Sequence, residues 1–394
     1  MSLLRDLASG VPLLEAVGRK EGAGRDVGHV KAVAKATSAR IFGAGEVLQP
    51  WLEQDSVTDV LVTGGQVWVD RGAGLERTGQ RMSVEEVGAL ARRLAAQCGK
   101  RLDQAAPIVD ATLPGGTRLH AVLPPLSTDG PLLSLRVHRQ RRMELGELVS
   151  AGALTPGVAG VLAALVERRA TTFICGATGC GKTTLLGALL TLVPPNQRIV
   201  CLEETSELRP NHPHVVHLQE REANVEGSGR VTLSDLTRAA MRMRPDRLVL
   251  GECRGPEVRD VLTALNTGHS GGFATLHANR AADVPARLIA LGALAALSPQ
   301  AVEVQFAAAV QAVVALRRLE CGRRIVSEVA VVQRAAAGVE CAPALAVRAG
   351  DEEAGLLVSA GPGLDGLVEL VGRQVVLAAL GRAADGAALA RSAK

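Results

Sequence analysis

The chain has 394 residues, of which 47% are hydrophobic and 21% are charged, and its net charge is +4 at pH 7. This composition is typical of a soluble globular protein, and the length favours two domains, because single cores rarely grow beyond about 300 residues. A charge this small gives no indication of nucleic-acid binding. No apolar run approaches the roughly 18–20 residues that cross a bilayer, so the sequence predicts no transmembrane segment.

Cysteine usage and the N-terminus both indicate the cytoplasm. The seven cysteines form no C-x-x-C pair, and several lie in apolar runs typical of buried strands, so we expect reduced thiols without a disulfide framework or a zinc site. The opening stretch "MSLLRDLASGVPLLEAVGRKEGAGRD" has charges between its apolar residues and does not resemble a signal peptide. We therefore expect a cytoplasmic protein that reaches a membrane only through partners.

The first part of the chain predicts a short leader and a small domain. Residues 1–45 are rich in Gly, Ala, Lys and Arg, with weak helical periodicity, and their structure is poorly determined by the sequence. From Val57, "VTDVLVTGGQVWVDRGAGLERT" alternates apolar and polar residues, which predicts antiparallel strands. Ser83 and Glu86 form a capping-box pattern before an amphipathic helix over 83–99. With two further strand candidates, in "ATLPGGTRLHAVLPP" and "GPLLSLRVHR", an α+β domain is predicted over 46–145.

The pattern changes after a linker and a helix that follow Met143. Continuous apolar runs, namely "TTFICG", "RIVCLEE", "RLVLGE" and "GGFATLHA", alternate with helical segments that start at Lys182 and cover 232–243 and 257–266. Unbroken apolar strands separated by helices indicate a parallel sheet buried on both faces. We predict an α/β domain over 146–345, followed by an Ala/Gly-rich tail over 346–394 to which the sequence assigns no function.

The motif "GATGCGKTT" indicates the chemistry of this second domain. It satisfies G-x-x-x-x-G-K-[ST] in full and lies between an apolar strand and a helix-forming run, which is the context of a phosphate-binding loop. Its glycines let successive backbone N–H groups face an anion, and the following helix adds its positive end. The predicted nucleotide-binding residues are Gly176, Ala177, Thr178, Gly179, Cys180, Gly181, Lys182, Thr183 and Thr184, with the Thr183 hydroxyl on Mg²⁺.

The lysine of this loop is unusual for the chain. Between residues 101 and 393 every other basic residue is an arginine. A compact ammonium fits between the β- and γ-phosphates, whereas a planar guanidinium is bulkier and differently directed, so the chemistry explains the exception at Lys182. Cys180 allows two interpretations, redox control or a small residue where only size matters, and the second is favoured.

Acidic residues follow two of the predicted strands. Glu203 and Glu204 come after "RIVCL", and Glu252 comes after "RLVLG". An ATPase with a phosphate loop needs a carboxylate at the end of a neighbouring strand, to hold the water shell of Mg²⁺ and to help position the attacking water. Two such sites in one sheet favour a catalytic role over simple solvation.

Four blocks, in order, resemble the type II/type IV secretion and pilus-assembly ATPase superfamily. They are "GATGCGKTT", the acidic box "CLEETSELRP", the strand region "RMRPDRLVLGECRGPEVRDVLTALNTGH" and the histidine box "GHSGGFATLHANR". The flanking "DATLPGGTRLHAVLPPLS" and "GPLLSLRVHR" resemble the N-terminal domain of this family, and the resemblance covers most of residues 55–335. Within the superfamily the chain is most similar to the CpaF/Tad branch, which powers Flp-type tight-adherence pili.

The resemblance implies a RecA-like ATPase domain in a homo-hexameric ring that docks on an inner-membrane platform of a pilus or secretion system and uses ATP and Mg²⁺. Glu203 is then the general base and Glu252 the ligand of Mg²⁺-bound water, with Arg254 counted in the same catalytic group. The acidic box has Glu204 where the family commonly has Asp, so the role of Glu204 stays open. The absence of a C-x-x-C pair of zinc ligands argues against the type II secretion branch.

Four further residues take their expected roles from the resemblance. His269 and His277 in the histidine box are expected to sense the γ-phosphate or to link to a neighbouring subunit; alternatively each is a hydrogen-bonded core residue. Arg118 and Arg136 lie where the N-terminal domain of this family lends arginines to the phosphates, a role that suits the charge spread over the transferred group. The alternative is that both are exposed strand arginines.

Three functions compete. The first is a motor for pilus assembly or secretion, and the second keeps the ATPase but moves DNA, as in conjugation. A DNA motor is expected to carry basic loops along a pore, and the mixed charges of this domain favour the first, so nucleic acid is not an expected partner. The third is a regulator that binds ATP without hydrolysing it. A regulator is expected to lack one of the two acids, and both Glu203 and Glu252 are present.

Overall fold

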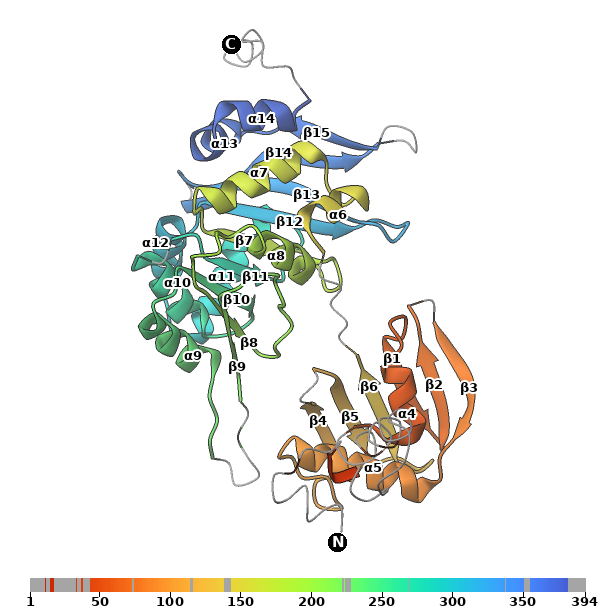
Figure 1. Cartoon of the computed structure of the whole chain (residues 1–394). Coiled ribbons are helices and arrows are strands. Elements are labelled where there is room, and N and C mark those ends of the chain that lie inside the picture. The colour runs from red at the N-terminus through yellow and green to blue at the C-terminus, as the bar shows by residue number, and fades with distance from the viewer. Residues whose placement is uncertain are drawn as a thin grey trace. The chain divides into compact units, whose positions relative to one another are not determined.

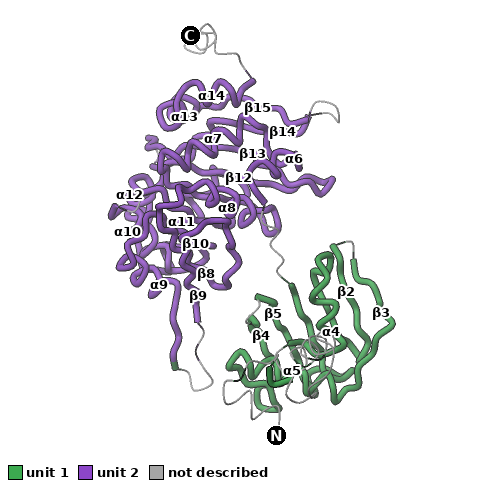
Figure 2. The backbone as a smooth tube through the Cα atoms, in the orientation of Figure 1, with its two compact units in different colours: residues 1–139, 224–228 green, residues 140–223, 229–394 purple. Residues whose placement is uncertain are grey.

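The protein consists of two compact units (Figure 2). The structure, a computed structural model, describes residues 43–381 except 73, 114–115, 138–142, 222, 224–227, 269, 337 and 351–354, together with positions 11, 15–17, 33 and 37. Residues up to 139 belong to unit 1, whereas 140–223 and 229–394 belong to unit 2. Almost all of the predicted leader therefore lies outside the described residues.

Unit 1 is an antiparallel sheet against which two helices pack (Figure 1). Its strands follow the order β3-β2-β1-β6-β5-β4, and every pairing is antiparallel. The helix predicted over 83–99 is α5, and the predicted cap is present, because the N–H of Glu86 donates to Ser83 Oγ and the N–H of Ser83 donates to the Glu86 carboxylate. The elements are α4 (Gly45–Leu52), β1 (Asp59–Thr63), β2 (Gln66–Asp70), β3 (Leu75–Arg81), α5 (Val84–Gln97), β4 (Ile108–Thr112), β5 (Arg118–Val122) and β6 (Leu132–Arg136).

Unit 2 is built on a nine-stranded sheet of order β15-β14-β13-β12-β7-β11-β10-β8-β9. The six strands from β12 to β9 in this order are parallel, and β13, β14 and β15 extend the sheet as antiparallel hairpins. The predicted α/β class with a mainly parallel sheet is confirmed. The strands are β7 (Thr172–Cys175), β8 (Ile199–Glu203), β9 (Val215–Gln219), β10 (Arg247–Cys253), β11 (Phe273–Leu276), β12 (Ala312–Arg318), β13 (Arg324–Ala335), β14 (Gly338–Ala349) and β15 (Leu356–Ala360).

Helices cover both faces of this sheet, which explains why its central strands are apolar throughout (Figure 1). Alternate residues of β7 serve the two cores, since Ile174 packs with one set of helices while Phe173 and Cys175 pack with the other. The first face carries α6 (Leu145–Ser150), α7 (Pro156–Glu167), α8 (Lys182–Leu190), α13 (Leu364–Val371) and α14 (Arg373–Ala379). The second face carries α9 (Leu233–Ala240), α10 (Val258–Asn266), α11 (Val284–Leu294) and α12 (Pro299–Ala309), with short 3₁₀ turns at Met241–Met243 and Ala281–Asp283.

The end of the chain differs from the predicted tail. Strand β14 continues to Ala349, β15 pairs with it, and α13 and α14 pack into the first core of unit 2 through buried side chains such as Leu367 and Val376. Unit 2 therefore extends past residue 345, at least to Gly381. The sequence missed this because the helices are only eight and seven residues long, too short for a clear 3.6-residue pattern.

Two further expectations concern thiols and membranes. All seven cysteines are free thiols: Cys98, Cys175, Cys180, Cys201, Cys253, Cys321 and Cys341. Burial raises the pKa of most of them, and it raises the pKa of Cys341 to about 12. Among the described residues, no helix combines the length and the apolar character that a bilayer crossing requires.

Candidate active site

The phosphate-loop motif connects β7 to α8, at the edge of the sheet where the parallel strands end. Gly176 has φ 153° and Gly181, the residue before α8, has φ 101°, conformations that side chains with a Cβ rarely adopt. Gly176 is also tightly enclosed, because a Cβ there would lie 2.5 Å from Cys180 Sγ and 2.6 Å from the Leu316 carbonyl oxygen of β12. The two glycines thus fix a tight turn whose N–H groups precede a helix N-terminus.

Lys182 is buried in the first turn of α8. Its ammonium donates to the carbonyl oxygens of Gly176 at 2.9 Å and Ala177 at 3.1 Å, and it lies 3.4 Å from Nδ1 of His277. A lysine ammonium has only donors, so Nδ1 of His277 is the acceptor in this contact. Hydrogen bonds to neutral groups therefore hold the Lys182 ammonium over the loop. Among the hydrogen-bond partners of Lys182 in the described residues, no carboxylate neutralises its charge.

His277 joins the loop to the second acidic strand end. It follows β11, and its Nε2 contacts Oε1 of Glu252, which lies near the end of β10. Burial and the nearby Lys182 charge lower the pKa of His277 below its ordinary value. The neutral ring with its proton on Nε2 fits both contacts, because it accepts at Nδ1 and donates to the carboxylate. His277 thus links Lys182 to Glu252 through one hydrogen bond at Nδ1 and one close contact at Nε2.

Arg254 extends this path to the first acidic box. Its guanidinium contacts Oε2 of Glu252 and donates to Oε2 of Glu204 at 3.0 Å. Burial acts to lower the pKa of Arg254, but the contacts with both glutamates outweigh burial and raise it. Glu204, which stands where the resembling family commonly has Asp, therefore acts on Glu252 only indirectly, through a half-exposed arginine.

Glu203 has a different environment from Glu204, its neighbour in the chain. It is 3% exposed, and its Oε1 accepts the backbone N–H groups of Glu207 and Leu208, both at 2.8 Å. Among the described residues its Oε2 is buried without a hydrogen-bond partner, and Nδ1 of His217 lies 3.8 Å from it. A carboxylate held by one oxygen, with the other unused, is suited to accept a proton from a water molecule.

The donors present fit a magnesium ion. Mg²⁺ is commonly held by one or two carboxylates together with substrate phosphates and water, so it does not need a cage of protein ligands. Glu252 offers a carboxylate near the end of β10, and Thr183 offers a hydroxyl in the first turn of α8. In the part of the chain that the structure describes, no group of three or more His, Cys, Asp or Glu residues could hold a metal.

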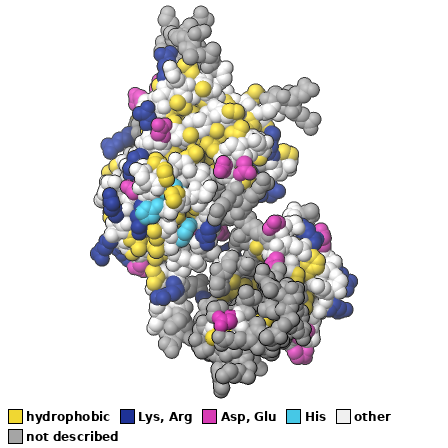
Figure 3. Space-filling model, viewed as in Figure 1, with side chains coloured by type: hydrophobic (Ala, Val, Ile, Leu, Met, Phe, Trp, Pro, Cys, Tyr) yellow, Lys and Arg dark blue, Asp and Glu magenta, His cyan; other side chains and the backbone are white. Residues whose placement is uncertain are grey.

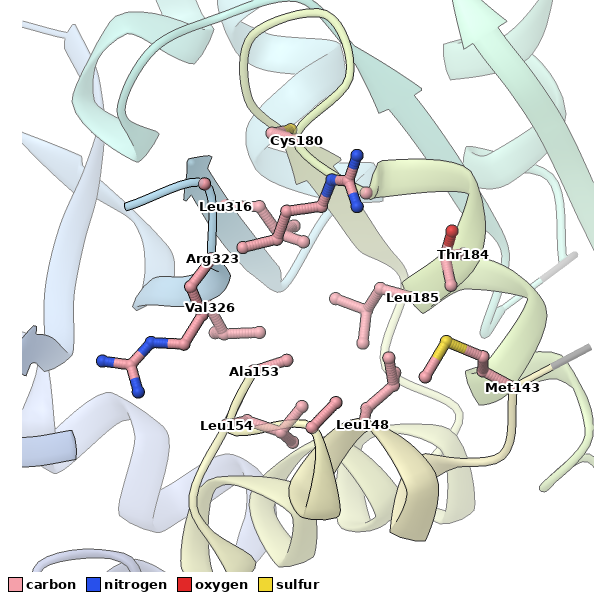
Figure 4. A pocket seen from close by; sticks show the side chains of 14 residues that line it. Met143, Leu148, Ala153, Leu154, Cys180, Thr184, Leu185, Leu316, Arg323 and Val326 are labelled. Carbon is pink, nitrogen blue, oxygen red and sulfur yellow. The ribbon is translucent and has the colours of Figure 1, made fainter. Parts of the chain in front are cut away.

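A pocket of about 290 Å³ opens beside the same loop (Figure 4). It is formed by the loop and α8, by the segment around α6, and by the hairpin of β12 and β13. Its wall is largely apolar, and the loop residues Cys180, Gly181 and Thr184 line it directly. Cys180 is buried, and burial raises the pKa of its thiol, which suits the interpretation that only its size matters.

Comparison with known proteins decides the family. Residues 46–353 match the family described as "Type II/IV secretion system protein", and this match spans most of the chain. The chain belongs to this family. It is 50% identical over 319 residues to a Mycobacterium tuberculosis protein named for conjugal transfer, covering 79% of this chain and 90% of that protein. It is 34% identical over 260 residues to the type IV secretion system protein PtlH of Bordetella pertussis, covering 59% and 76%.

One solved structure supports the fold of this type II/IV secretion system protein. The crystal structure of the pilus retraction motor PilT with bound ADP matches with a TM-score of 0.53 at 22% identity, covering 73% of this chain and 81% of that one. The predicted superfamily and the predicted link to secretion systems are confirmed at the level of the family.

The structure brings together some of the predicted residues of this secretion system protein but not all. Lys182, Glu252, Arg254 and His277 form one contiguous group. Arg118 and Arg136 lie in unit 1, opposite each other on β5 and β6, and Arg136 Nε donates to Asp59 at 2.9 Å. His269 lies outside the described residues.

Sequence reasoning missed several residues around the loop. Arg324, at the start of β13, donates from Nε to the Gly179 carbonyl at 2.8 Å, and Gly251 allows β10 to approach Glu203, since a Cβ there would lie 2.8 Å from Glu203 Cγ. Arg324 belongs to none of the quoted motifs, and Gly251, although it lies in the strand block that contains Glu252, gave no sign of its contact, because both contacts join segments far apart in the chain.

Proposed function

We propose that this protein is a Mg²⁺-dependent ATPase that works as a hexameric motor of a pilus or secretion system, on an inner-membrane platform. The observation that carries the proposal is the path from Lys182 through His277 to Glu252, beside a glycine turn built for phosphates. A lysine and a carboxylate in the places of Lys182 and Glu252 have defined roles in phosphoryl transfer to water. Membership of the type II/IV secretion family supports the link to secretion.

The residues divide the hydrolysis between them. The loop N–H groups and Lys182 would hold the β- and γ-phosphates, while Thr183 and Glu252 would hold Mg²⁺, which would supply positive charge for the phosphate oxygens. Glu203 takes a proton from the attacking water through its unused Oε2. His277 keeps the Glu252 carboxylate oriented. Because His277 also contacts Lys182, binding of the γ-phosphate by Lys182 would change the contacts of His277.

Arg118 and Arg136 are proposed to contribute positive charge to the phosphates in the assembled ring, and His269 to act with His277. The proposal for the arginines rests on the resemblance of the N-terminal domain and on their pairing side by side on neighbouring strands. Arg136 is 63% exposed, so its ion pair with Asp59 contributes little to stability and leaves the guanidinium available.

The cargo has two candidates. Resemblance to the CpaF/Tad branch favours a pilus motor. The relative from Mycobacterium tuberculosis, which is 50% identical, is named for conjugal transfer and favours a DNA-transfer system as the second candidate. On the face drawn in Figure 3, the Lys and Arg side chains of unit 2 lie in separate spots with Asp and Glu among them, which does not resemble a continuous DNA track.

The test is the ATPase rate per protein chain across a wide range of protein concentration. A ring with shared sites predicts a specific activity that rises with concentration, and Arg136→Ala is expected to lower its plateau at least about tenfold. Asp59→Asn is the matched control, because it breaks the same ion pair and keeps the arginine. Activity independent of concentration, or equal loss in both variants, would contradict the shared site.

A further inference from the structure

Glu328 is a half-buried carboxylate that the proposed hydrolysis does not use. It lies in β13 between the buried residues Val326 and Val329, at the edge of the sheet where the phosphate loop begins. The register shows this, because Ala315 of β12 pairs with Cys175, the last residue of β7, on one side and with Glu328 on the other. Burial raises the pKa of the Glu328 carboxyl, and a charged group in such surroundings costs free energy unless it is hydrogen-bonded.

The partner of Glu328 is a backbone N–H group. Ala281 donates this N–H to Oε2 of Glu328 at 3.3 Å, across 47 residues of chain. Ala281 is fully buried and begins the short 3₁₀ turn that leads into α11. Arg280, the residue before the turn, is extended and provides no side-chain cap. Strand β13 therefore supplies the acceptor that the local sequence does not, and it holds the start of this turn in place.

This hydrogen bond fixes one end of the segment that carries His277. The other end is fixed by β11, which pairs with β7 and β10, and His277 is the first residue after β11. Only residues 277–280 lie between β11 and Ala281, so the segment is short and anchored on both sides. Within it, His277 contacts both Lys182 and Glu252. Loss of the anchor at Ala281 would therefore allow the ring of His277 to move away from these two partners.

The same strand also supports the phosphate loop, because Arg324 donates from Nε to the Gly179 carbonyl at 2.8 Å. Strand β13 lies between β12 and β14 in the sheet and pairs with both, which makes it a firm support. Misplacement of a catalytic group by about 1 Å can cost about a hundredfold in rate. We propose that Glu328 is a positioning residue of this site, which acts through His277 by anchoring the backbone segment that carries it. The proposal rests on the proposed ATPase function and adds a positioning residue to that site.

The experiment measures kcat and KM for ATP hydrolysis with the full chain, for wild type, Glu328→Met and Glu328→Gln, each with and without His277→Gln. Methionine has a side chain of similar length, but its thioether is only a weak acceptor, whereas glutamine keeps a carbonyl oxygen that accepts an N–H. Glu340→Met is the matched control, because Glu340 is an exposed glutamate of the neighbouring strand β14 and its carboxylate accepts a hydrogen bond from Gln333.

Glu328→Met is expected to lower kcat at least about tenfold and to change KM less than about threefold, since Lys182 and the loop N–H groups still hold the phosphates. Glu328→Gln is expected to recover kcat to within about threefold of wild type, and the control is expected to resemble wild type. In the His277→Gln background, Glu328→Met should lower kcat less than about twofold further, because no histidine is left to position. Equal losses in the Met and Gln variants, a loss of the same size with and without His277, or a wild-type kcat in Glu328→Met would each overturn the proposal.

Hydrogen exchange of peptides that cover residues 277–283, followed by mass spectrometry without nucleotide, tests the anchor independently of activity. Exchange is expected to be at least about fivefold faster in Glu328→Met than in wild type and close to wild type in Glu328→Gln, because only the first variant frees the Ala281 N–H. Equal exchange in all three proteins would overturn the anchoring. A wild-type protein that hydrolyses no ATP would instead refute the proposed function, while the exchange result would still decide the anchor, so the two failures are distinguishable.

Discussion

Three glycines in and after the phosphate loop are expected to respond differently to replacement by alanine. At Gly176 the new Cβ would lie 2.6 Å from the Leu316 carbonyl, and φ is 153°, so the substitution adds overpacking of about 1–3 kcal/mol to backbone strain of similar size. At Gly179 no atom lies within 4 Å, and only the left-handed φ of 73° opposes alanine, at about 1–2 kcal/mol. At Gly187, inside α8, neither obstacle exists, and alanine is expected to stabilise the helix by about 0.5–1 kcal/mol.

Thermal unfolding and ATP binding of the three variants test this order. For a unit of this size each kcal/mol shifts Tm by about 2–4 °C, so Gly176→Ala is expected to lower Tm by at least about 5 °C and Gly187→Ala to raise it by about 2 °C. ATP affinity is expected to fall most for Gly176→Ala, since the loop must move away from β12, and to be unchanged for Gly187→Ala. A Gly176→Ala protein with wild-type Tm and affinity would refute the packing of the loop against β12.

Three further predictions concern the titratable groups of the site, namely His277, the pair of Glu204 and Arg254, and the thiol of Cys180. The pKa of His277 is lowered from its ordinary value of 6.5, so as pH drops the unfolded chain binds a proton at this residue before the folded protein does, and stability should fall below about pH 6.5. His277→Gln should lose this part of the pH dependence of Tm. A Tm profile that is the same in the variant and in wild type would contradict this prediction. A double-mutant cycle of Glu204→Gln and Arg254→Gln should give a coupling of about 0.5 kcal/mol in unfolding free energy, because both side chains are more than a third exposed; a coupling above about 2 kcal/mol would mean that the pair is effectively buried. Cys180→Ala should keep its ATPase rate within about twofold and Cys180 should resist thiol reagents, whereas loss of activity on mild oxidation would restore the redox interpretation.

The sequence was most informative where local chemistry fixes the structure. The motif of the phosphate loop, the capping box of Ser83 and the apolar central strands all depend on neighbouring residues, and the structure has each of them. The structure also places the acidic ends of β8 and β10 at the same edge of the sheet, because these two neighbouring strands are parallel.

The contacts between distant segments could not be predicted in this way. The strand order places β11 and β10 between β7 and β8, so Glu252 rather than Glu203 joins the lysine path. The bridge from Arg254 to Glu204 and the support of Gly179 by Arg324 depend on the same tertiary arrangement. The hairpins and helices after residue 338 were missed because their apolar residues form no long period.

The central claim is that the buried Glu203 activates water for ATP hydrolysis, and one measurement tests it most directly. ATP turnover and ATP binding are compared for wild type, Glu203→Gln and Glu204→Gln at a protein concentration where activity no longer rises. The account predicts that Glu203→Gln binds ATP normally but loses at least about a hundredfold in turnover, whereas the adjacent Glu204→Gln keeps most of both, because of these two neighbours Glu203 has the buried carboxylate oxygen without a hydrogen-bond partner and Glu204 is 38% exposed and paired with Arg254. Wild-type turnover in Glu203→Gln would contradict it.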